Sequence, residues 1–168
     1  MTSKRPRLKI PFEGFDIILE CCSISLLCLM WLYVFKIYGE LPETVSTHFN
    51  AQGIADGFSN KSTLWFIPII ATLLYVCLII LNKFPHLHKY KVNITETNAY
   101  KNYRFSTRIL RVVNLLSITL MAYITYFIVG QAKDKEIEIS SLFLPLVIGL
   151  SIILPIVILI YQRKLNKD

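Results

Sequence analysis

The sequence is poor in charge and in glycine. Asp, Glu, Lys and Arg make up 17% of its 168 residues, whereas soluble domains average roughly 25%. Its six glycines form no phosphate-binding loop, and the patterns H-E-x-x-H and G-x-S-x-G are absent. We therefore expect no P-loop, no zinc hydrolase of that type and no α/β-hydrolase, and we predict that the protein is not an enzyme and needs no cofactor.

Cysteine is used in a way that argues against a disulfide framework. The four cysteines, Cys21, Cys22, Cys28 and Cys77, all lie inside apolar segments and form no C-x-x-C pair. A cysteine in apolar surroundings behaves as a small hydrophobic residue with a raised pKa. We expect these four to fill space within helices rather than to hold a metal ion.

Long apolar segments are what the sequence has in excess, since 54% of its residues are hydrophobic. A bilayer core about 30 Å thick requires roughly 20 helical residues, and backbone groups in lipid must bond internally. Four segments meet this length, which predicts an all-α integral membrane protein with a single membrane domain over residues 1–168. The expected bundle has four transmembrane helices, at about 15–38, 64–82, 98–129 and 142–161.

The distribution of basic residues predicts the orientation. Of eighteen Lys and Arg residues, fourteen precede the first helix, lie at the connection between the second and third, or follow the fourth. Only Lys36, Lys61, Lys133 and Lys135 fall on the other side. The positive-inside rule places both termini and loop 83–97 in the cytoplasm and loop 39–63 outside, as in a multi-pass protein of a bacterial inner membrane. The basic charge then faces membrane lipids, and we expect no nucleic-acid partner.

The outer loop 39–63 contains strong turn signals. Leu41-Pro42 favours an extended start, and Gly53 and Asp56-Gly57 favour turns, with positive φ expected at both glycines. We predict a structured, hairpin-like loop whose polar side chains are joined by hydrogen bonds and recognise a ligand. The candidate binding residues are Pro42, His48, Phe49, Asn50, Gly53, Asp56, Gly57 and Lys61.

His48 and Asp56 are metal-ligand types, but two ligands do not define a site, so no metal is expected. The same holds for His86 and His88 in the loop of the opposite side. Hydrogen bonding within the loop is the alternative that we favour for His48 and Asp56.

Polar side chains inside the membrane are a second place where function is found. Glu20 and Asn114 are such residues, and Pro155 is expected to kink the fourth helix. Glu20 is expected to pair with an arginine of the third helix. The arginines there, Arg104, Arg108 and Arg111, follow a helical spacing and form a cytoplasmic basic stripe, which we expect to bind lipid headgroups.

The loop motif resembles a known module. Leu41-Pro42-Glu43, Thr47-His48-Phe49-Asn50 and Asp56-Gly57, followed by Lys61 and an apolar helix, resemble a bacterial membrane domain of unknown function. That domain forms the N-terminal part of the SdpI-like family, which gives immunity to a secreted toxic peptide and relays its presence to a cytoplasmic repressor. The resemblance covers about residues 15–82 and implies a short, stand-alone four-helix member that lacks the family's additional helices.

These features predict a non-enzymatic recognition, resistance or signalling protein that meets a peptide or protein ligand through loop 39–63. The alternative is an accessory subunit or small transporter that uses Glu20 and the Pro155 kink, and an intramembrane enzyme comes third. A homo-oligomer is a possible assembly. For the transporter alternative it would supply the second repeat that a chain of this length lacks.

Overall fold

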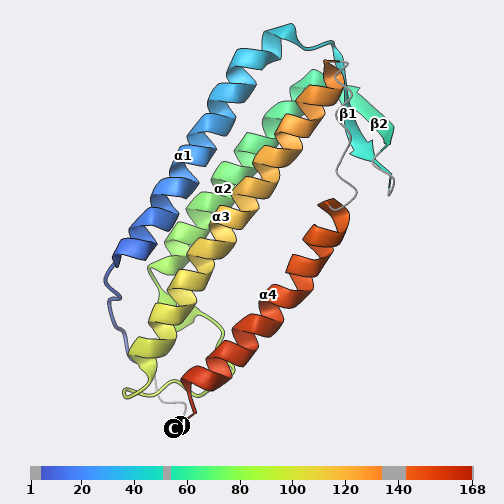
Figure 1. The fold of residues 1–168 in the computed structure, drawn as a ribbon. Coiled ribbons are helices and arrows are strands. Elements are labelled where there is room, and N and C mark those ends of the chain that lie inside the picture. The colour runs from blue at the N-terminus through green and yellow to red at the C-terminus, as the bar shows by residue number, and fades with distance from the viewer. Residues whose placement is uncertain (1–4, 51–53, 134–142, 168) are drawn as a thin grey trace.

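The computed structural model describes residues 5–50, 54–133 and 143–167. It contains four long helices: α1 (Gly14–Ile37), α2 (Phe66–Asn82), α3 (Ala99–Ala132) and α4 (Phe143–Leu165) (Figure 1). All four are long and apolar enough to cross a membrane. The predicted all-α architecture is confirmed, and the chain is a multi-pass membrane protein.

Helices α1, α2 and α3 form a three-helix body. Leu27 and Met30 of α1, Ala71 and Tyr75 of α2 and Ile118 of α3 form a buried cluster midway along it. The chain order makes α1 and α3 run in the same direction and α2 in the opposite one (Figure 1).

The loop between α1 and α2 folds into a β-hairpin. Strand β1 (Thr44–Phe49) pairs antiparallel with β2 (Ala55–Asn60), and the register is irregular around His48. One-turn helices at Tyr38–Glu40 and Lys61–Trp65 join the hairpin to α1 and α2. Because of this second turn, α2 begins at Phe66 rather than at the predicted residue 64.

Helix α4 lies at the edge of the body, beside α3 (Figure 1). Ring stacking joins Phe105 to Tyr161 (4.9 Å between centroids) and Tyr123 to Phe143 (4.8 Å). Gln162 is the single buried residue among the α4 side chains that the structure describes. The helix continues through Pro155 to Leu165, four residues beyond its predicted end.

The two ends of the body differ in chemistry. We call the end that carries residues 5–13, the connection 83–98 and the C-terminal end of α4 the basic end, and the opposite end the hairpin end. At the hairpin end four aromatic rings, those of Trp31, Phe35, Tyr38 and Trp65, contact one another with centroids 4.8–6.1 Å apart. This cluster is the kind of aromatic belt found at membrane interfaces.

Cysteine labelling tests which end faces the cytoplasm. After replacement of the four native cysteines, Thr47→Cys in β1 should react with an impermeant maleimide in intact cells, because Thr47 is exposed at the hairpin end. Thr97→Cys at the basic end should react only after permeabilisation. The reverse pattern would show that the charge asymmetry does not set the orientation of this chain.

Candidate functional site

One face of the hairpin anchors it to the body. Val45 of β1 is buried with Val34 of α1, Val129 of α3 and Leu64 of the short helix before α2, and the Phe49 ring packs edge-on against Phe127 at 4.8 Å. The hairpin is thus fixed against the ends of all three helices of the body.

The opposite face of the hairpin is open. Phe58 and Ile54 expose 62% and 63% of their surface, and Asp56 lies between them in the sequence. His48 Nδ1 contacts the Asp56 carboxylate across the strands. We call the surface formed by His48, Ile54, Asp56 and Phe58 the outer face; it combines two exposed apolar side chains with a hydrogen-bonded histidine and aspartate.

Several predicted binding residues instead build the hairpin. Phe49 faces inward, and the Asn50 side chain accepts a hydrogen bond from the Ile54 backbone N–H (3.0 Å), which closes the turn. Lys61 donates to the Leu41 carbonyl (3.2 Å) and pairs with Glu43 (3.1 Å). Their role in the structure is to shape the loop.

The other predicted loop residues are spread out. Pro42 is exposed where the loop begins, and Gly53 lies outside the described residues. His48 and Asp56 do come together on the outer face, as the prediction of a hydrogen-bonded loop requires. Ile54 and Phe58 were not among the predicted binding residues. Their spacing, two residues before and two after Asp56, could have indicated that all three side chains share one face of a strand.

Gly57 is required for space, not for a positive φ. Its φ lies outside the left-handed region, so that expectation was wrong, and it pairs with His48 across the hairpin. A Cβ at position 57 would lie 2.8 Å from the His48 Cβ. This is shorter than the contact distance of two non-bonded carbon atoms. The glycine therefore permits the tight, irregular crossing that presents His48.

At the basic end, charged side chains join α1 to α3. Three acids on one face of α1 and its N-terminus meet three arginines on one face of α3, and we call the set the ion ladder. Its members are Glu13, Asp16, Glu20, Arg104, Arg108 and Arg111.

The inner part of the ladder is buried. Asp16 and Arg111 expose 3% and 7% of their surface. The Asp16 carboxylate accepts from Arg108 (3.2 Å) and Arg111 (3.4 Å). Glu20 accepts from Arg111 (3.2 Å) and from the Tyr75 hydroxyl of α2 (3.2 Å). The expected partnership of Glu20 with an arginine of the third helix is therefore confirmed, with Arg111 as the partner.

The outer part of the ladder is more open to water. Glu13 accepts from Arg104 (2.5 Å) and Arg108 (2.9 Å), and the hydrogen bond from Arg104 is the main cause of a lowered Glu13 pKa. In the structure these arginines pair with acids of the same chain, and binding of the arginine stripe to lipid headgroups stays a prediction.

Asn114, the second polar residue predicted inside the membrane, is buried in α3. Its surface is 3% exposed, and its Oδ1 has no hydrogen-bond partner among the described residues. It lies one turn further into the bundle than Arg111 and joins no cluster of titratable groups that could move a proton.

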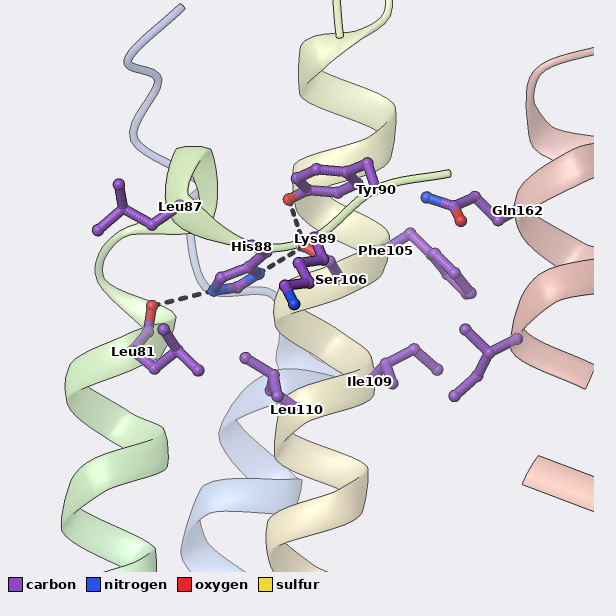
Figure 2. A pocket seen from close by; sticks show the side chains of 11 residues that line it. Leu81, Leu87, His88, Lys89, Tyr90, Phe105, Ser106, Ile109, Leu110 and Gln162 are labelled. Carbon is purple, nitrogen blue, oxygen red and sulfur yellow. Dashed lines mark hydrogen bonds between the residues drawn. The ribbon is translucent and has the colours of Figure 1, made fainter. Parts of the chain in front are cut away.

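A pocket of about 360 Å³ lies at the basic end, between the end of α2, the following loop, α3 and α4. Figure 2 shows its polar side, where His88, Tyr90 and Ser106 converge. His88 Nε2 donates to the Leu81 carbonyl (3.0 Å), so the neutral ring accepts at Nδ1 from the Ser106 hydroxyl (2.9 Å). The Tyr90 hydroxyl lies 2.7 Å from Ser106 Oγ. Sequence reasoning missed this network, because two of its acceptors are the backbone carbonyls of Leu81 and Pro85.

Burial keeps the network uncharged. Loss of hydration lowers the pKa of His88 and raises the pKa of Tyr90 to about 12, so at neutral pH both are in their neutral forms. Arg5 donates to the His88 carbonyl (2.7 Å) and lies over the Tyr90 ring at 5.4 Å. The N-terminal segment thereby fastens the loop that forms one wall of the pocket.

Within the described residues, no three His, Cys, Asp or Glu side chains converge as metal ligands. His48 and Asp56 bond to each other, and His88 bonds to Ser106 and a carbonyl.

Two comparisons with known proteins found a match. Residues 26–72, from the middle of α1 through the hairpin into α2, match the profile of a domain of unknown function (DUF1648). An uncharacterized protein from Archaeoglobus fulgidus is 30% identical over 111 residues, which are 60% of this chain and 61% of the relative. The chain thus spans about three fifths of that relative's length. No solved structure matches the chain significantly.

The ladder can be tested by removing its most buried acid. Asp16→Asn leaves Arg108 and Arg111 without part of their counter-charge, and removing one partner of a buried ion pair costs roughly 3–5 kcal/mol. We expect the loss of stability to be near the lower value, because Arg111 keeps its ion pair with Glu20. It is measured as a lower unfolding midpoint of the protein in detergent. Glu43→Gln, which removes an exposed surface pair, is the control and should change stability by less than about 1 kcal/mol. Equal effects of the two changes would contradict the assigned role of the ladder.

The tight crossing in the hairpin can be tested at Gly57. Gly57→Ala should force the strands apart at a cost of about 1–3 kcal/mol, seen as hydrogen exchange at least several-fold faster in residues 44–60 and unchanged in α1 and α3. Gly39→Ala is the control, because its new Cβ meets no atom within 4 Å. Adding His48→Gly to Gly57→Ala removes the clashing Cβ and should restore slow exchange; no restoration would show that the clash is not the cause.

Proposed function

We propose that this chain is a non-enzymatic recognition protein of the bacterial cell membrane, which binds a secreted peptide through the outer face of its hairpin and confers resistance or relays a signal. The observation that carries the proposal is the outer face itself. The hairpin packs against the body on one side and on the other exposes Phe58 and Ile54, which flank Asp56 and its partner His48.

Exposed apolar side chains on a small, ordered element are a common feature of binding surfaces. On the helices, lipid covers such side chains, whereas Phe58 and Ile54 belong to the hairpin, which lies beside the end of α3 (Figure 1). Asp56 adds an acceptor and a negative charge, which suits a partner with an amide or basic group next to an apolar one. A membrane-active peptide has this combination.

The resemblance to the SdpI-like family supports the same function. The residues that carry it lie in the hairpin and its two flanking turns, and the matched domain of unknown function covers the same region. The immunity activity of that family is the reason to test toxic peptides first.

The geometry gives less support to a transporter that uses Glu20 as a proton carrier. Both carboxylate oxygens of Glu20 are engaged, one with Arg111 and the other with Tyr75. A proton carrier needs a carboxylate oxygen that is free to bind and release a proton, whereas in Glu20 neighbouring side chains hold both oxygens.

The test is protection of growing cells. Cells that express the protein should tolerate at least fourfold more of one or more members of a panel of secreted, membrane-active bacterial peptides. Phe58→Ser should abolish this tolerance without lowering the amount of protein in the membrane. Phe66→Ser is the matched control, because Phe66 is equally exposed (61%) at the start of α2 but lies outside the hairpin.

A fluorescein-labelled active peptide should bind to the purified wild-type protein and to Phe66→Ser, and should not bind to Phe58→Ser. Tolerance that survives Phe58→Ser and Asp56→Asn but is lost in Glu20→Gln would overturn the proposal and assign the function to the membrane interior. Absence of tolerance to every peptide in wild-type cells would contradict the resistance activity.

A further inference from the structure

The pocket at the basic end contains a polar side chain that the protein itself leaves unused. Gln162 of α4 is 7% exposed, and its side-chain amide has no hydrogen-bond partner among the described residues. Figure 2 shows the amide directed from α4 toward Tyr90 and Phe105, into the pocket. The amide lines the pocket and can therefore offer both a hydrogen-bond donor and an acceptor to a ligand bound there.

The walls of the pocket change from polar to apolar with depth in the membrane. On α4, Gln162 is followed one turn deeper by Ile158; on α3, Ser106 is followed one turn deeper by Leu110. Side chains one turn apart on a helix lie about 5.4 Å apart along its axis. The pocket therefore has the polarity gradient of a lipid, with a polar region at the membrane surface and an apolar region beneath it.

The charge of the pocket is complementary to an anion. Lys89 is the one charged side chain in its lining, and no Asp or Glu lines it. His88 remains neutral because burial lowers its pKa. The ladder acids, which would repel an anion, are occupied by their arginines on the α1 side of α3.

Lipid can reach this pocket from the side. Helix α4 meets α3 through stacked rings near its two ends and buries almost none of its surface against the body. A volume of about 360 Å³ is at the small end of the range for ligand sites, enough for the glycerol region and part of one acyl chain.

We propose that this pocket is a binding site for one anionic glycerophospholipid of the leaflet at the basic end. Lys89 binds the phosphate, Gln162 binds the glycerol or ester oxygens, and an acyl chain lies along Ile109, Leu110 and Ile158. The bound lipid fills the space between α3 and α4 and holds the fourth helix to the body.

The test measures lipid binding by the full chain, purified in detergent and freed of lipid. Added phosphatidylglycerol should raise its unfolding temperature more than phosphatidylcholine does, and native mass spectrometry should show one retained molecule. Lys89→Gln should weaken phosphatidylglycerol binding at least fivefold, whereas Lys91→Gln, an exposed lysine outside the pocket, should leave it unchanged.

Gln162→Leu keeps the side-chain volume and should lower affinity for both lipids, while the lipid-free protein becomes no less stable. Glycerol 3-phosphate alone should neither stabilise the protein nor compete; if it does both, the ligand is a soluble phosphate and not a lipid. Equal stabilisation by the two lipids, or unchanged binding in both Lys89→Gln and Gln162→Leu, overturns the proposal. None of these measurements depends on the peptide-binding activity of the hairpin.

Discussion

The ion ladder between α1 and α3 is the interaction on which the rest of the structure depends. In a bilayer, apolar helices gain little from contact with one another, because lipid chains are as apolar as the side chains. Charged groups near the membrane surface are different, since each needs a specific partner. Asp16 and Arg111, both buried, therefore fix how far α3 is shifted along α1.

That alignment reaches the hairpin end. Helices α1 and α3 run in the same direction, so the ladder at their starts also sets the relative height of their ends. There Val34 and Val129 lie together under the hairpin. The polar contacts at one end thus place the apolar cluster at the other, on which β1 rests.

The architecture could be predicted from the sequence because it follows from length and hydropathy. Four apolar segments, each long enough to cross a membrane, allow few folds other than a bundle of transmembrane helices. Pro42 and Asp56-Gly57 restrict the backbone conformation of the loop that joins the first two helices. The partner of Glu20 was also predictable, since an acid in an apolar helix requires a cation. The partners of Arg104 and Arg108 were not, because headgroups and acids compete for arginines at the membrane surface, and helical spacing does not distinguish them.

The candidate sites were harder to predict for two physical reasons. The role of Gly57 depends on the distance to the Cβ of His48 across an irregular strand pair, which no local pattern encodes. The network at His88 depends on the carbonyl of Leu81 and on a serine of α3, and carbonyls are present at every residue. Exposed Phe58 and buried, unpaired Gln162 have meaning only once their surroundings are known.

The ladder also has a consequence for how the chain is made. Asp16 and Arg108 are 92 residues apart, and a ribosome adds about 5–20 residues per second. For roughly 5–20 seconds, α1 is present with its acids and without the arginines that neutralise them. During that interval the acids of α1 depend on water or lipid headgroups for their partners, and synthesis of α3 supplies the arginines that pair with them.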